Sequence, residues 1–324
     1  MFIPVERKVG RGLCGRALEI EDRFHHGTLQ RRERKLRRLV ENSRITSPDQ
    51  KEVLSKIELL AVDLDGTLLD SSHKPSEGTQ EAIEAASIRG IRTVLVTGRN
   101  RAGLLYIMNQ MALKQPYICS GGGYIADLET NEVIARFLIS RESAERVVGI
   151  TREENAAVFF EADLTIYAEA SLEIVKSVGP LDELDYVLTQ DILHDYPGPP
   201  QKIVIVDDDP RVLSAIEEKI LAKGIPVFLS YSAPRYLEIT QAGVSKGSAL
   251  IQLAKYLRIP LDRVAAIGDE NNDLSMFEIA GVAIAMGNAT AEVKRAADII
   301  APNNDESGVA WALWQLINAR DESS

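Results

Sequence analysis

Short apolar runs that alternate with helical stretches constrain the fold of this chain more than any other feature. The run Leu59-Leu60-Ala61-Val62 is apolar at every position, which is typical of a strand covered on both faces of a parallel sheet. The same alternation predicts helices at residues 80–87, 101–111, 248–257, 274–280, 291–297 and 309–319, and further strands at 91–96, 117–120, 264–267, 282–285 and 298–301. Strands and helices in this order predict an α/β fold with a doubly wound, Rossmann-like parallel-sheet core.

The middle of the chain has a different rhythm. Strands are predicted at 133–139, 158–161, 202–206 and 226–230, and helices at 143–152 and 210–222. We therefore expect a core made of residues 57–123 and 236–324, with a second α/β domain inserted at 124–235.

Residues 1–56 are expected to form a basic N-terminal extension that is flexible. Residues 31–38 hold six basic side chains in eight positions. This run suggests an arm that binds nucleic acid or an acidic partner, although a solvated extension is the commoner meaning of such a run. The segment lacks the apolar stretch of a signal peptide. A start further downstream is the remaining alternative and would require a non-Met start codon near Val53 or Leu54, because the next methionine is Met108.

The charge balance argues against nucleic acid as the main partner. Residues 1–58 hold 14 Lys and Arg against 9 Asp and Glu, which leaves 23 basic and 39 acidic residues in the rest of the chain. No apolar run is long enough to span a membrane. The two cysteines, Cys14 and Cys119, make no disulfide framework, so we expect a cytoplasmic protein.

Polar side chains follow three of the predicted strands at the point where each strand ends. Asp63-Leu64-Asp65-Gly66-Thr67 follows the first strand, Thr97-Gly98-Arg99 the second, and Gly268-Asp269-Glu270-Asn271-Asn272-Asp273 the strand at 264–267. Ligands of open parallel sheets bind at the carboxyl ends of the strands. These residues are therefore expected to share one site.

Up to four carboxylates would meet there, from Asp63, Asp65, Asp269 and Asp273. Carboxylates that close raise one another's pKa unless a cation lies among them. A donor set of oxygens without His or Cys favours a hard ion, and we expect Mg²⁺. A carboxylate beside Mg²⁺ and a phosphate is placed to attack phosphorus and form an aspartyl-phosphate, while a neighbouring acid protonates the leaving oxygen.

Lys246 completes the predicted site. It opens a helix, where the macrodipole disfavours a cation unless an anion is bound nearby. Thr97 and Gly98 could offer a hydroxyl and an N–H to the same phosphate.

The sequence resembles the haloacid dehalogenase superfamily, and within it the Cof-type phosphatase branch. The resemblance covers about residues 57–317 and rests on the segments at 63–67, 97–99, 245–250, 268–276 and 287–289. It implies that Asp63 is the nucleophile and a metal ligand, and that Asp65 is the general acid and base and binds the metal through its backbone carbonyl. It also implies a cap domain, here residues 124–235, which selects the substrate.

The resemblance assigns the other site residues as well. Thr97 and Lys246 would bind the phosphoryl group, and Asn272 would approach it. Asp269 would bind Mg²⁺, with Asp273 at the metal or just behind it. The chain departs from the branch at Ser120, where Asn is usual, and this changes the hydrogen bonding expected at the hinge or the substrate edge.

Several other residues have simpler structural interpretations. Asp207-Asp208-Asp209 before Pro210 reads as a helix cap, and Gly121–Gly123 as a turn. Trp311 and Trp314 are expected in the core, and the four histidines are expected to be solvated: His25, His26, His73 and His194.

The sequence thus predicts a Mg²⁺-dependent phosphatase that acts on a small phosphorylated metabolite, with a sugar phosphate as one candidate. A phosphosugar mutase or phosphotransferase on the same scaffold is an alternative, and a non-catalytic phosphometabolite-binding protein is another. A dehalogenase would leave Asp65 without a role. The oligomeric state and the identity of the substrate are left open at this stage.

Overall fold

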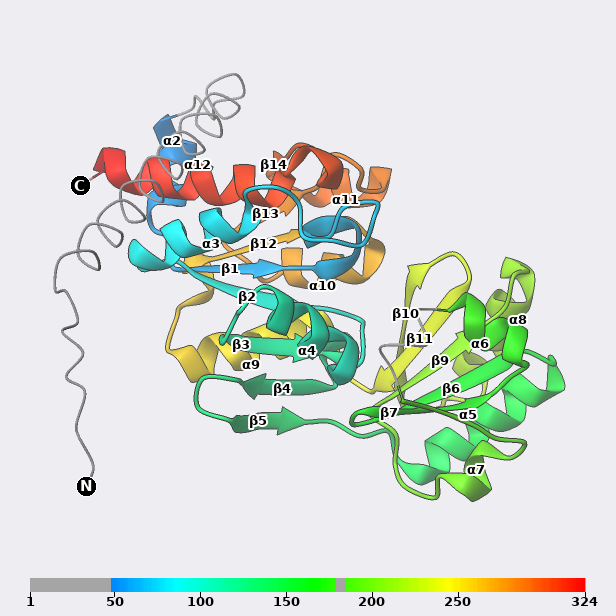
Figure 1. The fold of residues 1–324 in the computed structure, drawn as a ribbon. Helices are drawn as coiled ribbons and strands as arrows, with labels where there is room; N and C mark the ends of the chain where they lie inside the picture. Colours follow the sequence, from blue (N-terminus) through cyan, green and yellow to red (C-terminus); the bar gives the residue numbers. More distant parts are fainter. Residues whose placement is uncertain (1–47, 179–184, 324) are drawn as a thin grey trace, which may run out of the picture. The chain divides into compact units, whose positions relative to one another are not determined.

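A computed structural model describes residues 48–178 and 185–323 of the chain. The basic run at 31–38 and the residues His25 and His26 lie outside the described residues. Two sheets organise the described part, and each carries its own helices (Figure 1).

The first sheet has eight strands in the order β14-β13-β12-β1-β2-β3-β4-β5. Its strands are β1 Leu59–Val62, β2 Arg92–Val96, β3 Pro116–Cys119, β4 Tyr124–Asp127, β5 Glu132–Arg136, β12 Val264–Gly268, β13 Val282–Ala285 and β14 Ile299–Ile300. The pairs from β14 to β3 are parallel, and Val62 lies opposite both Leu95 and Ile267. This register brings the carboxyl ends of β1, β2 and β12 to the same edge of the sheet.

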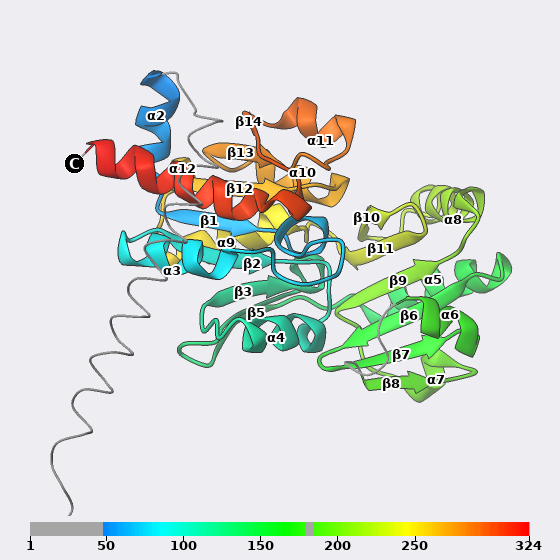
Figure 2. The same cartoon turned by 45° about the horizontal axis from the view of Figure 1, so that its top comes forward.

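Helices cover both faces of this sheet. They are α2 Pro48–Ser55, α3 Thr79–Ile88, α4 Arg101–Gln110, α9 Lys246–Leu257, α10 Leu274–Phe277, α11 Ala291–Ala296 and α12 Gly308–Ser323. Helix α12 packs against α2 and α3, and α9 packs against α10, β3 and β4 (Figure 2). The fully buried strand β1 between these layers confirms the predicted doubly wound parallel core.

The last helix anchors part of the segment that was predicted as an extension. Residues Pro48–Ser55 form α2, where Leu54 is buried against the core. Trp311 and Trp314 on α12 are buried as well, which confirms their expected place in the core.

The second sheet has six strands in the order β10-β11-β9-β6-β7-β8 and is called the inserted sheet below. Its strands are β6 Ala157–Ala162, β7 Thr165–Glu169, β8 Asp185–Leu188, β9 Lys202–Val206, β10 Val227–Ala233 and β11 Tyr236–Gln241. Four helices accompany it: α5 Arg141–Glu153, α6 Leu172–Ser177, α7 Ile192–Asp195 and α8 Pro210–Ala222. Asp209 caps α8 by accepting a hydrogen bond from the Arg211 N–H at 2.9 Å, which confirms the structural interpretation of that acidic run.

The two faces of the inserted sheet differ in what covers them. One face buries a large apolar cluster against α5 and α8 that includes Val158, Phe160, Ile203 and Ile205. The alternate residues of the same strands, such as Phe159 and Val206, belong to a smaller cluster on the opposite face.

Two strands differ from the expected division of the chain. β4 and β5, expected within the insertion, extend the first sheet as antiparallel strands. The reason is the tight turn Ser120–Gly122, which returns the chain alongside β3; at Gly122 (φ 105°) a Cβ would lie 2.4 Å from the Ser245 carbonyl oxygen. At the other end, β11 was expected in the core but forms a hairpin with β10 in the inserted sheet.

Within residues 48–178 and 185–323, no helix has both the length and the apolar character needed to cross a membrane.

Candidate active site

Asp63 marks the point where β1 gives way to a tight loop. Its backbone N–H still donates to the Ile267 carbonyl oxygen of β12 at 3.1 Å, and the chain then turns through Leu64–Leu68. Gly66 has a φ of 74°, and a Cβ at this position would lie 2.2 Å from Asp269 Oδ2. Only glycine fits this approach, so the loop and the β12 end come together because residue 66 has no side chain.

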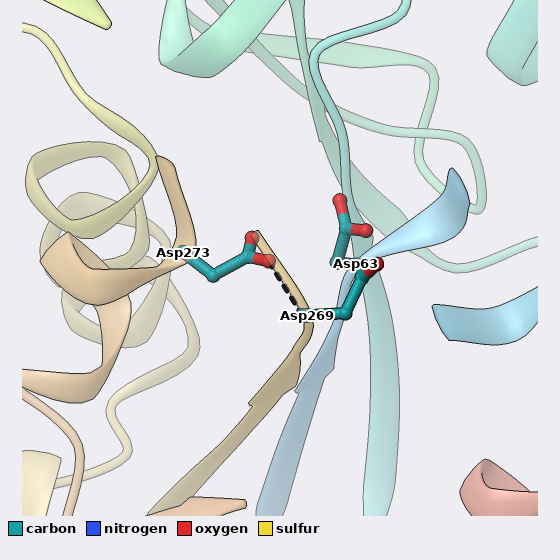
Figure 3. Close-up of side chains that lie close together, drawn as sticks. All are labelled: Asp63, Asp269 and Asp273. Atoms are coloured by element: carbon teal, nitrogen blue, oxygen red, sulfur yellow. Dashed lines mark hydrogen bonds between the residues drawn. The ribbon is translucent and has the colours of Figure 1, made fainter. Parts of the chain in front are cut away.

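Three carboxylates gather beyond the ends of β1 and β12 (Figure 3). Asp63, Asp269 and Asp273 are all buried, and each offers an oxygen within 4.8 Å of the others. Asp273 Oδ2 accepts hydrogen bonds from the Asp269 N–H at 2.9 Å and the Glu270 N–H at 3.0 Å. Thr67 Oγ1 donates to Asp269 Oδ1 at 2.8 Å. These bonds fix the carboxylates of Asp269 and Asp273.

Lys246 lies among the carboxylates. As the first residue of α9 it is buried, and its Nζ lies 2.6 Å from Asp63 Oδ1 and 2.6 Å from Asp273 Oδ1. Nζ also donates to Asn272 Oδ1 at 3.2 Å. One ammonium group cannot balance three carboxylates, so the centre retains a negative field that favours a bound cation.

The pKa values of this centre reflect its burial. Burial, followed by the charge of Asp273, raises the pKa of Asp63 well above its ordinary value despite the opposing effect of Lys246. The same two causes raise the pKa of Asp269 to about 7. For Lys246, burial acts to lower the pKa, but the carboxylates of Asp273 and Asp63 outweigh it and raise that pKa. The centre is therefore electrostatically strained without a further positive charge.

Asp65 does not join the carboxylate cluster, although the sequence suggested up to four carboxylates. Its carboxylate accepts two hydrogen bonds from Arg99, from Nη2 at 2.6 Å and from Nε at 2.8 Å. The alternation that places residues i and i+2 on one side holds only within a strand, and the chain leaves β1 before Asp65. The Asp65 side chain is half exposed and borders the same cavity as Asp63.

The remaining predicted residues also border this cavity, whose volume is about 880 Å³. Thr97, Gly98, Lys246 and Asn272 line it together with Asp63. Thr97 is buried, and its Oγ1 accepts a hydrogen bond from the Arg99 N–H at 3.0 Å. The structure thus brings a hydroxyl, an ammonium group and an amide to one wall.

Comparison with known proteins places this arrangement in a family. Residues 60–313 match the haloacid dehalogenase-like hydrolases. The Bacillus subtilis protein named phosphatase YwpJ is 31% identical over 287 residues, which cover 81% of this chain and 100% of that protein. A second B. subtilis relative, named 5-amino-6-(5-phospho-D-ribitylamino)uracil phosphatase YwtE, is 30% identical over 290 residues, 82% of this chain and 99% of that protein.

A solved structure agrees with these relatives. The crystal structure of a haloacid dehalogenase-like hydrolase from Bacteroides thetaiotaomicron superposes with a TM-score of 0.71 at 31% identity, covering 80% of this chain and 98% of that chain. This chain belongs to the haloacid dehalogenase-like hydrolase family. The predicted resemblance is therefore confirmed. Because relatives of this similarity are named as phosphatases, this family member is a phosphatase.

Sequence reasoning missed several residues that line the cavity of this hydrolase. Glu161, Lys202 and Glu238 reach it from the inserted sheet, and His73 from the loop between β1 and α3. A signal for Lys202 and Glu238 exists in the sequence, because Lys202 begins the otherwise apolar strand β9 and Glu238 stands between Leu237 and Ile239 in β11. The signal names no ligand, because only tertiary structure brings these strands to the site.

The structure describes two of the histidines, His73 and His194, and both are exposed as expected. The Nδ1 atom of His194 lies 3.0 Å from Asp195 Oδ1, and this hydrogen bond is the main cause of the raised pKa of His194. Both residues lie in α7, far along the chain from the carboxylate cluster.

Proposed function

We propose that the protein is a Mg²⁺-dependent phosphatase that hydrolyses a small phosphomonoester through an aspartyl-phosphate on Asp63. The observation that carries this proposal is the buried meeting of Asp63, Asp269 and Asp273 around Lys246 at the wall of a cavity large enough for a metabolite. We propose that the inserted sheet and its helices, residues 141–241, act as the cap that selects the substrate.

The donor set of the centre fits a magnesium ion. Asp63, Asp269 and Asp273 supply only carboxylate oxygens, with no sulfur or imidazole nitrogen, and their excess negative charge requires a cation. These residues would hold the ion, with the backbone carbonyl of Asp65 as a further ligand. Bound Mg²⁺ supplies charge neutralisation at the phosphoryl oxygens.

The chain's own residues account for the transfer step. A carboxylate oxygen of Asp63 forms a bond to phosphorus while the bond from phosphorus to the leaving alcohol oxygen breaks. Asp65 gives its proton to that oxygen, and the alcohol departs. Asp65, now ionised, takes a proton from a water molecule that attacks phosphorus. The P–O bond to Asp63 breaks, inorganic phosphate leaves, and both side chains return to their starting states.

Three further groups position the phosphoryl group. The Lys246 ammonium group neutralises part of its charge, the Thr97 hydroxyl and the Gly98 N–H donate hydrogen bonds, and Asn272 approaches it with its side-chain amide. Lys246 and Thr97 are buried and already held by neighbouring groups, so they need little reorganisation during the reaction.

A phosphorylated polyol or sugar derivative is the substrate class that we favour. The relative named for 5-amino-6-(5-phospho-D-ribitylamino)uracil is a phosphatase of such a compound. The cavity volume of about 880 Å³ can accommodate a molecule of this kind.

Phosphate release across a panel of sugar and polyol phosphates, with Mg²⁺ and with EDTA, tests the proposal. We expect release only with Mg²⁺, and none from the Asp63→Asn variant. The surface variant Asp321→Asn, which loses an exposed ion pair with Arg89, should keep full activity. Full activity in Asp63→Asn would refute the mechanism. Isomerised sugar phosphate without free phosphate would show a mutase, and tight binding without any turnover would show a binding protein.

A further inference from the structure

A buried ion cluster lies on the cavity side of the inserted sheet. Glu161 on β6, Lys202 on β9 and Glu238 on β11 are 5%, 2% and 6% exposed. All three line the cavity that holds Asp63. The register places Glu161 directly opposite Lys202, and Nζ of Lys202 lies 2.9 Å from Glu161 Oε1 and 3.3 Å from Glu238 Oε1.

Lys202 has no donor left for another group. Its ammonium group has three N–H bonds. These are taken by Glu161, Glu238 and the carbonyl oxygen of Gly98, to which Nζ also donates. The cluster holds two carboxylates against one ammonium group, so it is short of donors.

One acceptor atom of the cluster lacks a donor. Glu161 Oε2 is buried and accepts no hydrogen bond of normal geometry, although the nearby Ser120 side chain acts to lower the pKa of Glu161; among the described residues it is the only buried carboxylate oxygen without a partner. A buried anionic oxygen without a partner is costly, and native proteins rarely tolerate one unless a ligand completes it. Because Glu161 lines the cavity, a molecule bound there can supply the donor.

The cluster lies next to the loop that faces the phosphate. Lys202 donates to the carbonyl of Gly98, and Gly98 directly follows Thr97. Through Lys202, Glu161 therefore lies near the loop at which we propose that the phosphate binds. The Oε2 atom is placed to accept from a part of the substrate close to the phosphate.

The wall beyond Glu161 is apolar and aromatic. Phe159, Ile166, Tyr186 and Tyr236 lie on the same face of the inserted sheet and line the cavity. Apolar walls with a few fixed polar groups are typical of sites where those polar groups determine specificity. Such a wall suits a planar or apolar end of the substrate, with Glu161 as its fixed acceptor.

We propose that Glu161, held by Lys202, is the specificity-determining residue that accepts a hydrogen bond from a hydroxyl or N–H near the phosphate of the substrate. The substrate class is then a phosphomonoester with such a donor next to the phosphate and a planar or apolar end against Tyr186 and Tyr236. This inference rests on the phosphatase function proposed for the Asp63 centre.

The Glu161→Met variant tests the proposal with two substrates. Ribitol 5-phosphate carries hydroxyls beside its phosphate, and p-nitrophenyl phosphate carries neither a hydroxyl nor an N–H on its leaving group. We expect wild type to prefer ribitol 5-phosphate. In Glu161→Met, kcat/KM for ribitol 5-phosphate should fall about 10- to 100-fold, mainly through KM, while that for p-nitrophenyl phosphate changes less than about threefold.

The variant should fold, because Lys202 keeps Glu238 and the Gly98 carbonyl as partners. Glu169→Gln is the matched control, since Glu169 lies on the same sheet, in β7, and pairs with Arg152 of α5 but does not line the cavity. It should leave both substrates unaffected. An equal loss with both substrates in Glu161→Met, no loss with either, or a wild type without the preference would overturn the role of Glu161.

A binding measurement separates this proposal from the proposed function. Calorimetry with ribitol 5-phosphate and the Asp63→Asn variant, with and without Glu161→Met, measures the contact without turnover. We expect the Kd to rise about 10- to 100-fold when Glu161 is lost. An unchanged Kd overturns the proposal even if the enzyme is a phosphatase. A wild type that releases no phosphate from either substrate with Mg²⁺ refutes the phosphatase function, whatever the Kd values are.

Discussion

Replacing Asp269 by asparagine should stabilise the metal-free protein and abolish its response to magnesium. The substitution removes one of three carboxylates from a buried centre in which Lys246 is the cation that lies among them. The hydrogen bond from Thr67 Oγ1 to Oδ1 can survive, because an amide oxygen accepts it as well. A weaker bond from Asn288 Nδ2 at 3.3 Å is lost.

The magnitude follows from the pKa of Asp269, which is raised from 3.8 to about 7. The unfolded chain releases this proton near pH 4, whereas the folded protein retains it until about pH 7. Between these values the folded state binds more protons, so the free energy of unfolding of the wild type falls as the pH rises. The full shift corresponds to about 4 kcal/mol, reached at a rate of about 1.4 kcal/mol per pH unit and complete near pH 8.

Urea denaturation in EDTA at pH 5, 6, 7 and 8 measures this effect. The free energy of unfolding of Asp269→Asn should exceed that of the wild type by about 1 kcal/mol at pH 5 and by about 2 to 4 kcal/mol at pH 8. Saturating Mg²⁺ should remove most of this difference at pH 8, because the wild type gains about 3 kcal/mol at a hundred times the Kd and the variant gains much less. The control Asp321→Asn removes only an exposed pair and should stay within about 1 kcal/mol of the wild type at every pH.

Two results would refute the reasoning. A variant less stable than the wild type in EDTA at pH 8 would mean that the three carboxylates do not repel one another in the folded protein. A stability difference that does not change with pH would mean that Asp269 does not titrate as its burial requires.

Three further predictions concern the loop, the acid and the first helix. Gly66→Ala, with φ at 74° and a Cβ 2.2 Å from Asp269 Oδ2, should lower both the melting temperature and kcat, and an unchanged kcat would contradict the role given to this turn. Asp65→Asn should slow kcat about 10²- to 10⁴-fold and let a phosphorylated protein accumulate with p-nitrophenyl phosphate, as detected by mass spectrometry; absence of that species would speak against Asp65 as the base. Deleting residues 1–44 should preserve kcat and the free energy of unfolding. Deleting residues 1–56 also removes buried Leu54 and the Lys51–Glu322 pair, and it should lower the free energy of unfolding by about 2 to 4 kcal/mol in urea denaturation. Equal stability of the two truncated proteins would contradict this prediction.

The order of elements could be predicted from the sequence because its signals are local. A fully apolar run such as Leu59–Val62 has to be covered on both faces, and the glycines and polar residues after it end the strand. For the same reason Asp63, Thr97 and Asp269 could be assigned to one edge of the sheet. The carboxyl ends of parallel strands meet there whatever the intervening residues are.

The sheet to which a strand belongs was harder to predict. β4 returns along β3 because of the turn at Ser120–Gly122, and β11 pairs with β10 through a hairpin. Both connections are short, and a short connection ties a strand to its neighbour more strongly than a shift in composition ties it to a domain.

The sequence by itself determined the α/β class, the positions of the strand ends and the chemical groups delivered there, because each depends on residues that are near one another in the chain. Only the tertiary structure decided that Asp65 faces Arg99 while Asp63, 183 residues from Lys246, meets that lysine. It also decided that Glu161 carries a buried oxygen without a partner. Strand register and the approach of distant segments decide which buried charges meet and which buried oxygen is left without a hydrogen-bond partner. No local sequence pattern encodes the register or the approach.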